Sequence, residues 1–278
     1  MKILITGSGS GIGNSLARSL AAEGAEIWGI GRSPQTRFQN DCDTAGLCFR
    51  HSQVDVSDWP QVAALRQEVG SDWPYLDALI CCAGVQSPIG PAMSLDPHAW
   101  SASVRVNLDG TFFVIRAFHD LLLRAASRAK VVCFSGGGAA TPRPQFAAYA
   151  VAKTGVVRLV ETLAEEWKDL PIDINAVAPG AINTRMTAEV LAAGPQLAGK
   201  KEYAQALEQQ QSGGAPVAKV VGLVRFLLSR ESDGINGKLI SAPWDPWDRL
   251  GNFKERLRQS DIYSLRRITP KDRGETWT

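Results

Sequence analysis

Short apolar runs recur along the chain, and they are nearly continuous rather than alternating with polar residues. Val, Ile and Leu dominate these runs, which is typical of strands that are buried on both faces of a sheet. Seven runs predict strands, at Lys2–Thr6, Glu26–Gly31, Cys48–Val54, Leu76–Cys81, Lys130–Ser135, Ile172–Ala178 and Lys238–Ser241.

Segments of helical length lie between these runs. The alternation of strands and helices implies right-handed crossovers between parallel strands. We therefore predict the α/β class, as a doubly wound parallel sheet (Rossmann fold) of about seven strands with helices on both faces. The predicted helices lie near Ile12–Ala22, Gln61–Val69, His98–Leu123, Tyr149–Lys168 and Val217–Ser229.

The chain has 278 residues and 45% hydrophobic content, enough for one α/β domain with a full core. We expect a single domain over residues 1–248 and a C-terminal extension over 249–278. Residues 186–216 are rich in Ala, Gly and Gln and interrupt the rhythm of strands and helices. Two interpretations of this segment remain open, a lid over the carboxyl edge of the sheet and a plain surface insertion.

Charge and cysteine use exclude several classes of protein. The net charge is +2, and the extension alone contributes +4, which is too short and modest a basic region to support nucleic-acid binding. No apolar run reaches the roughly 20 residues that span a bilayer, and the chain opens on a strand without room for a signal peptide. Five cysteines and three histidines show no metal-ligand spacing. We expect a cytoplasmic protein with no metal site and no membrane partner.

A glycine-rich run follows the first predicted strand and opens the first predicted helix. It reads Thr-Gly-Ser-Gly-Ser-Gly-Ile-Gly over residues 6–13. The glycines permit close approach of the backbone to a pyrophosphate, and the helix N-terminus offers free N–H groups and a positive dipole end. In this context the run is typical of dinucleotide binding rather than of a plain glycine turn. The residues expected against the cofactor are Gly7, Ser10, Gly11, Ile12 and Gly13.

The end of the second predicted strand bears on the choice of cofactor. An acidic residue there would bind the ribose 2′-hydroxyl of NAD, but no acid occurs before Asp41. Arg32 and Ser33 stand there instead, and a guanidinium suits the 2′-phosphate of NADP. We predict NADP as the preferred cofactor, with NAD as the alternative in which Arg32 only faces solvent.

Tyr149 and Lys153 are four residues apart in a predicted helix, which places the phenol and the ammonium on one face. The unperturbed pKa of a phenol, about 10, is high for acid–base chemistry at neutral pH. A neighbouring cation favours the phenolate and lowers that pKa. Taken alone, such a pair also describes a solvated helix face.

With these motifs together, the chain resembles the short-chain dehydrogenase/reductase family, in its non-extended, single-domain branch. The resemblance covers about residues 1–241. It is carried by the glycine turn at Thr6–Gly13, Asp55-Val56 after the third strand, Ala83-Gly84 after the fourth, Asn107, Tyr149-x-x-x-Lys153, and the segment Pro179-Gly180-Ala181-Ile182-Asn183-Thr184.

The resemblance implies an NAD(P)-dependent oxidoreductase that interconverts a small alcohol and a carbonyl compound. It implies that Tyr149 transfers the proton, that Lys153 lowers the pKa of Tyr149 and binds the nicotinamide ribose, and that Asn107 holds a water. It also implies a homodimer or homotetramer paired through the two long helices. Further cofactor contacts are implied for Asp55, Val56, Ala83, Gly84, Pro179, Gly180, Ile182 and Thr184.

The sequence departs from the family pattern near the catalytic serine. That serine usually stands thirteen residues before the tyrosine, where this chain has Gly136, and Ser135 comes one residue earlier. We expect Ser135 to take the role, through a lengthened Gly136–Gly138 loop. The alternative is an NAD(P)-binding sensor or scaffold that has lost turnover. The family's two asparagines after the fourth strand are replaced by Cys81 and Cys82, which we expect to be buried thiols, with a redox switch as the alternative.

The C-terminal extension contains aromatic and basic residues. Trp244 and Trp247 are separated by Asp-Pro near the expected substrate mouth. We hypothesise that the tail folds over the active site of its own or a neighbouring subunit and favours an anionic or sugar-like substrate. The alternative is a tail packed on the surface or at an oligomer contact. The arginines that carry this hypothesis are Arg256, Arg258, Arg266 and Arg267.

Overall fold

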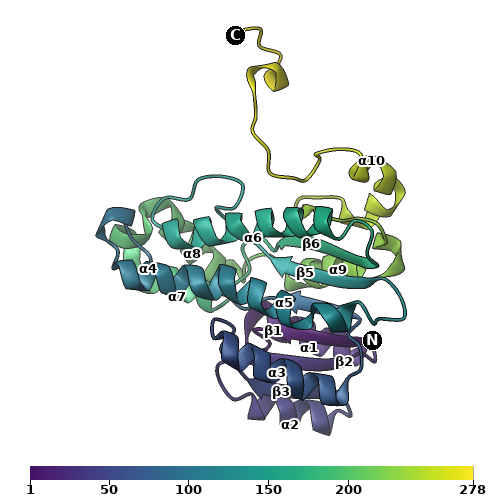
Figure 1. Cartoon of the computed structure of the whole chain (residues 1–278). Coiled ribbons are helices and arrows are strands. Elements are labelled where there is room, and N and C mark those ends of the chain that lie inside the picture. The colour runs from purple at the N-terminus through teal and green to yellow at the C-terminus, as the bar shows by residue number, and fades with distance from the viewer. Residues whose placement is uncertain (278) are drawn as a thin grey trace.

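One parallel sheet of seven strands runs through the middle of the protein (Figure 1). The computed structural model describes residues 1–277. The strand order is β3-β2-β1-β4-β5-β6-β7, so the direction in which strands are added reverses between β1 and β4. The predicted doubly wound α/β fold is confirmed. The strands are β1 (Lys2–Thr6), β2 (Glu26–Gly31), β3 (Phe49–Gln53), β4 (Ala78–Cys81), β5 (Ala129–Phe134), β6 (Ile172–Ala178) and β7 (Leu239–Ser241).

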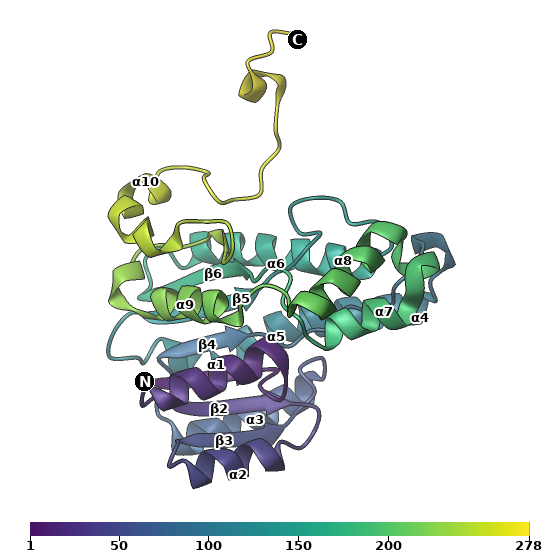
Figure 2. The same ribbon diagram turned by 180° about the vertical axis from the view of Figure 1, so that it is seen from behind.

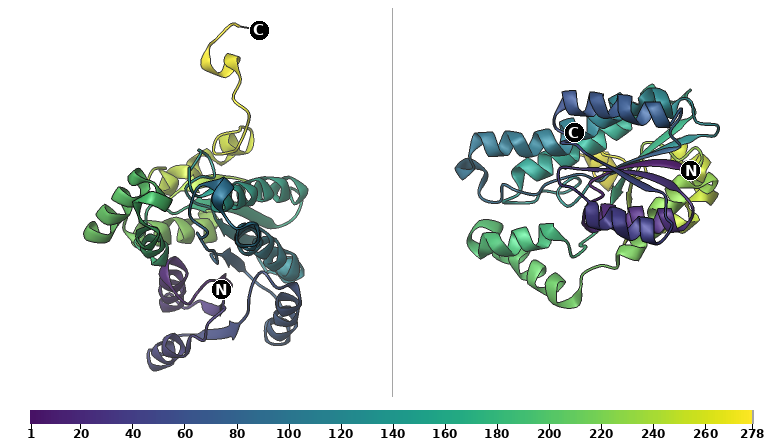
Figure 3. Two further views of the ribbon diagram at one scale, coloured as in Figure 1. Left: turned by 90° about the vertical axis from the view of Figure 1, so that its left-hand side faces the viewer. Right: turned by 90° about the horizontal axis from the view of Figure 1, so that it is seen from below.

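Helices cover both faces of the sheet, as Figures 1 and 2 show from opposite sides and Figure 3 shows edge-on. Because the central strands β1, β4, β5 and β6 are buried on both faces, their apolar side chains divide between two cores. One core contains side chains of α3 (Trp59–Asp72), α5 (Gly110–Leu122) and α6 (Ala147–Glu166). The other contains side chains of α1 (Gly11–Ala22), α2 (Thr36–Thr44) and α9 (Val217–Leu228).

The helices differ from the prediction at two places. Helix α2 was not predicted, because its polar sequence buries only Phe38 and Cys42. The single helix predicted over His98–Leu123 is divided into α4 (Pro97–Val104), a π-helical turn at Arg105–Asp109, and α5. A π-helical turn inserts an extra residue without ending the helix, so the hydrophobic pattern alone does not reveal it.

The segment predicted as a lid forms two helices, α7 (Arg185–Ala198) and α8 (Lys200–Ser212). A kink at Gly194 and Pro195 interrupts α7. Val190, Ala198 and Ala206 from these helices form a small apolar cluster with Phe146 and Tyr149. The hairpin therefore covers the start of α6, and its movement as a lid stays a prediction.

The C-terminal extension packs at the far end of α6 from Tyr149. Leu250 and Leu257, the latter in α10 (Lys254–Arg258), are buried in the α1–α9 core. The backbone N–H of Leu239 in β7 donates to Tyr263, and the backbone N–H of Leu265 donates to Glu161.

Residues 266–277 then lead away from the rest of the protein (Figures 1 and 3). The hypothesis that the tail folds over its own active site is therefore wrong for the residues that the structure describes. The alternative of a tail packed on the surface describes residues 249–265. This packing continues across residue 248 without a break. The domain boundary that the sequence predicts at residue 248 stays a prediction.

Within residues 1–277, every helix is too short or too polar to cross a lipid bilayer. The same residues contain no cluster of three or more His, Cys, Asp or Glu side chains with the geometry to hold a metal ion.

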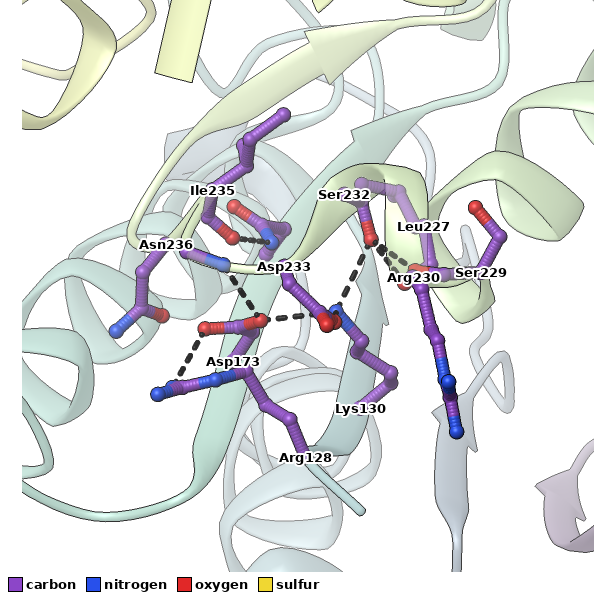
Figure 4. Close-up of polar contacts among 12 residues, drawn as sticks. Arg128, Lys130, Asp173, Leu227, Ser229, Arg230, Ser232, Asp233, Ile235 and Asn236 are labelled. Carbon is purple, nitrogen blue, oxygen red and sulfur yellow. Dashed lines mark hydrogen bonds and ion pairs between the residues drawn. The ribbon is translucent and has the colours of Figure 1, made fainter. Parts of the chain in front are cut away.

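A buried ion pair joins β5 to β6 near the end of the sheet at which these strands begin (Figure 4). Lys130 Nζ lies 2.9 Å from Asp173 Oδ2, and both side chains are almost fully buried. Lys130 also donates to Ser232, and Asp173 accepts from Arg128 and from the backbone of Gly234. These bonds attach the loop before β7 to the strands beneath it. Such a pair stabilises a fold only while both partners are present.

We predict that Asp173→Ala lowers the free energy of unfolding by about 3–5 kcal/mol, because the buried Lys130 loses its buried carboxylate partner and keeps only Asp233, whose side chain is 39% exposed. Chemical denaturation of the two proteins measures this difference. Glu23→Ala is the matched control, since it removes the exposed pair with Arg225 and should cost about 1 kcal/mol or less. Equal losses in the two variants would contradict the prediction.

Candidate active site

A cleft of about 690 Å³ lies where the strand order reverses, along the carboxyl ends of β1, β2 and β4. Ligands in open α/β sheets bind at this place, because the crossovers on either side diverge there. Twelve of the predicted cofactor residues line the cleft. They are Gly7, Ser10, Gly11, Ile12, Gly13, Arg32, Ser33, Asp55, Val56, Ala83, Gly84 and Thr184.

The glycine turn holds the cleft open by close backbone contacts. Gly7 has φ of +72°, and a Cβ on it would lie 2.9 Å from the backbone of Ala83. A Cβ on Gly13 would lie 2.3 Å from the carbonyl oxygen of Gly7. The side chain of Ser10, the residue before α1, caps none of the helix N–H groups. These N–H groups at the start of α1 therefore have no capping side chain, and such groups suit the pyrophosphate of a dinucleotide.

Basic residues gather at the β2 end of the cleft. Arg32 and Ser33 line it as predicted, and Arg18 and Arg37 line it as well. Arg18 is paired with Asp41 at 2.9 Å. Arg37 was missed by the sequence reasoning, because helix α2, which carries it, was not predicted. The only signal was a second arginine five residues after Arg32.

The start of α7 forms another wall of the cleft. A Cβ on Gly11 would lie 3.3 Å from the methyl group of Thr184, which is the N-cap of α7. Of the remaining predicted cofactor residues, Gly180 contacts Pro243 and Ile182 pairs with Gly214 in an isolated bridge. Together with Pro179, these residues connect β6 to α7 beside the cleft rather than lining it.

Lys153 and Asn107 meet at Gly84, where the cleft reaches α6. A Cβ on Gly84 would lie 2.7 Å from Asn107 Oδ1 and 3.4 Å from Lys153 Nζ. Asn107 is fully buried in the π-helical turn, and its amide donates to the backbone carbonyls of Val85 and Ser103. Lys153 Nζ donates to the carbonyl oxygen of Phe134 over 2.8 Å. The structure therefore brings these predicted residues together at one point.

Tyr149 is the buried acid–base candidate beside them, with only 5% of its surface exposed. Lys153 Nζ lies 5.7 Å from the centre of its ring. Burial raises the pKa of Tyr149 to about 12, and Arg143 is the cation that acts against this rise. Burial also lowers the pKa of Lys153 to about 8. That Lys153 lowers the pKa of Tyr149 stays a prediction.

The expected serine does not point at the phenol. Ser135 is buried just after β5, and its Oγ donates to the backbone carbonyl of Lys153 over 3.5 Å. Gly136 faces the phenol instead, since a Cβ on it would lie 2.2 Å from Tyr149 Oη. The phenol oxygen thus occupies the space that a side chain at position 136 would need. A catalytic role for Ser135 stays a prediction.

The thiols after β4 differ in their burial. Cys81 is buried, whereas Cys82 is partly exposed and lines the cleft. Burial of its thiol raises the pKa of Cys82 to about 12. Both cysteines are free, and a protonated thiol reacts slowly with oxidants. This protonation favours the structural interpretation over a redox switch.

Comparison with known proteins identifies the family. The family model for short chain dehydrogenases matches residues 1–194. The chain is 29% identical to gluconate 5-dehydrogenase of Gluconobacter oxydans, across 86% of this chain and 91% of that protein. It is 30% identical to levodione reductase of Leifsonia aquatica, again across 86% of this chain and 91% of that protein.

A solved structure agrees with this match. It is assigned to an NAD(P)-dependent gluconate 5-dehydrogenase of Beutenbergia cavernae and contains bound NADP. It superposes with a TM-score of 0.76 at 26% identity, covering 87% of this chain and 94% of that one. Because the family model spans most of the chain and the fold agrees, this protein belongs to the short-chain dehydrogenase family and is an NAD(P)-dependent oxidoreductase that interconverts an alcohol and a carbonyl compound.

Proposed function

We propose that the chain reduces or oxidises a small hydroxylated substrate with Tyr149 as the acid–base group. The observation that carries this proposal is the convergence of Lys153 and Asn107 on Gly84, beside the buried phenol of Tyr149. A bound nicotinamide supplies or accepts the hydride. Tyr149 donates the matching proton to the carbonyl oxygen, or accepts it from the alcohol.

The other residues position these groups and exclude water. Lys153 is fixed by its bond to the Phe134 carbonyl, so its ammonium points toward Gly84 at the end of the cleft. Asn107 is held by two backbone carbonyls, which leaves its Oδ1 facing the backbone N–H of Val85 and the Gly84 turn. Helices α7 and α8 cover the phenol and lower the local dielectric, which strengthens each of these polar interactions.

The proposed substrate is a small molecule, and its class does not depend on any single relative. The names of the relatives refer to gluconate and levodione, an open-chain sugar acid and a small dione. These names support an alcohol or carbonyl compound of modest size.

The exposed apolar side chains of Phe112 on α5 and Val151 on α6 support pairing of two copies through these helices. Five free thiols support a reducing, cytoplasmic location.

The proposed cofactor is NADP. Arg32, Ser33 and Arg37 line the end of the cleft near β2, and Arg18 is already neutralised by Asp41. A 2′-phosphate would be stabilised by the two remaining guanidinium groups, whereas the 2′-hydroxyl of NAD would find no carboxylate among the first residues after β2.

The second candidate function is an NAD(P)-binding sensor with little or no turnover. Gly136 at the usual place of the serine favours it, because no hydroxyl is directed at the phenol from that position. The retained Tyr149 and Lys153 favour the enzyme.

We predict that Tyr149→Phe lowers kcat by about a hundredfold to ten-thousandfold and leaves NADPH affinity nearly unchanged, because only the proton donor is removed. The absorbance of NADPH, followed with a panel of carbonyl compounds, measures turnover, and fluorescence titration measures binding. NADPH binding by the wild type without turnover on any carbonyl compound would favour the sensor instead.

We predict that Arg32→Ala raises KM for NADPH by about tenfold or more and changes KM for NADH by less than about twofold, because only NADPH carries the phosphate. Initial rates with each cofactor measure the two constants. Arg124→Ala is the control, since Arg124 lies on the surface in a pair with Asp120. Similar effects on both cofactors would contradict the assignment of Arg32.

We predict that Lys153→Met abolishes most activity and leaves the protein at least as stable at pH 7. The pKa of Lys153 is about 8 in the folded protein and about 10.4 when unfolded, so the unfolded chain holds more protons between these values. The wild type should therefore gain stability relative to Lys153→Met as pH rises from about 8 to about 10. Thermal unfolding of both proteins across this range measures the difference in stability. A wild type that loses stability relative to Lys153→Met as pH rises would refute the prediction.

A further inference from the structure

Arg143 stands next to the ring of Tyr149 and is not among the residues that line the cofactor cleft. It lies in the loop between β5 and α6, where its guanidinium carbon is 3.8 Å from the centre of the Phe146 ring and 5.8 Å from that of Tyr149. Its side chain is only 17% exposed. Gly136 and Gly137 precede it and place no side chain between the guanidinium and the phenol. A cation is therefore held beside the ring of the acid–base candidate.

The guanidinium connects three segments that surround Tyr149. Its Nε and one terminal nitrogen donate to a single oxygen of Glu202, over 3.1 and 2.7 Å. Its other terminal nitrogen donates to Gln86 over 3.3 Å, and the amide of Gln86 reaches the backbone of Met186. Glu202 belongs to α8 and Met186 to α7, so the helical hairpin meets the active site at this arginine.

The Arg143–Glu202 pair does not use the full binding capacity of either group. Arginine binds carboxylates most strongly through two parallel bonds to two oxygens, but here both bonds go to one oxygen of Glu202. The Glu202 side chain is 27% exposed at the rim of the hairpin, where it can exchange its partner for water. A carboxylate that reached Arg143 with both oxygens would therefore compete well with Glu202.

We propose that Arg143 is a specificity-determining residue that binds the carboxylate of a hydroxy-acid substrate, with Glu202 as the resting occupant that the substrate displaces. This inference rests on the proposed function, since the same substrate must present its alcohol carbon to Tyr149. Binding places the negative group beside Arg143 and leaves the alcohol between it and the phenol. Displacement of Glu202 also removes the bonds between α8 and Arg143, which couples substrate binding to the hairpin.

The two partners of this pair give opposite predictions. Arg143→Gln should raise KM for a carboxylate substrate by about tenfold to a hundredfold, because a charge-assisted interaction is lost. It should change KM for an uncharged substrate of the same carbon skeleton by less than about twofold. Glu202→Gln should lower KM for the carboxylate by a few fold, because the competing carboxylate is removed. A pair that only fastens α8 to the core would make the two variants behave alike.

The experiment measures initial rates on matched pairs, D-gluconate against D-glucitol and D-glycerate against glycerol. Arg50→Gln is the control, since Arg50 is also paired with a carboxylate, Asp72, but lies on β3 away from the site. Thermal unfolding of each variant shows whether it remains folded. Equal losses on charged and uncharged substrates in Arg143→Gln, or a raised KM in Glu202→Gln, would overturn the inference.

A second readout separates this inference from the proposed function. Calorimetric titration of the NADPH-loaded wild type and of NADPH-loaded Arg143→Gln with the same hydroxy acids measures binding without turnover, because the reduced cofactor cannot accept a hydride. A wild type that binds a carboxylate through Arg143 but oxidises none of the panel would refute the proposed function and support the inference. A wild type that oxidises uncharged substrates and binds no carboxylate would support the proposed function and refute the inference.

Discussion

The close backbone contact between the ends of β1 and β4 determines the position of everything in the candidate site. The hydroxyl of Thr6 accepts hydrogen bonds from the backbone N–H groups of Cys82 and Ala83, both over 2.9 Å. Gly7 then passes so near Ala83 that no side chain fits between them. This contact places the start of α1 against the Ala83-Gly84 turn. The glycine turn and the Lys153–Asn107 end of the cleft are consequently parts of one rigid structure.

Burial controls the electrostatics around the phenol. Tyr149 and Lys153 are both removed from water, so each is pushed toward its neutral form, with the pKa of the phenol raised and that of the ammonium lowered. The guanidinium of Arg143, 5.8 Å from the centre of the Tyr149 ring, acts against the rise in the pKa of that phenol. A permanent cation next to a buried, uncharged acid suits a site that must stabilise negative charge on demand.

The sheet and the glycine turn could be predicted from sequence because their signals are local. Strands such as Lys2–Thr6 and Ile172–Ala178 show continuous apolar runs, and the structure reproduces both ranges to the residue. Helix α2 escaped because two buried side chains, Phe38 and Cys42, are too few to form a visible period. Arg37 was missed with it. The π-helical turn around Asn107 escaped because one inserted residue leaves the overall hydrophobic pattern helical.

The sequence by itself determined the fold class, the cofactor turn and the Tyr149–Lys153 pair, since each depends on residues that are neighbours along the chain. Only the tertiary structure decided what faces the phenol, because that depends on the path of loops from three separate elements. It directs Ser135 toward the backbone of α6, presents Gly136 to the phenol, and brings Arg143 and Glu202 together across 59 residues of sequence. It also directs the C-terminal extension to the opposite end of α6, since Leu250 and Leu257 find their apolar partners there.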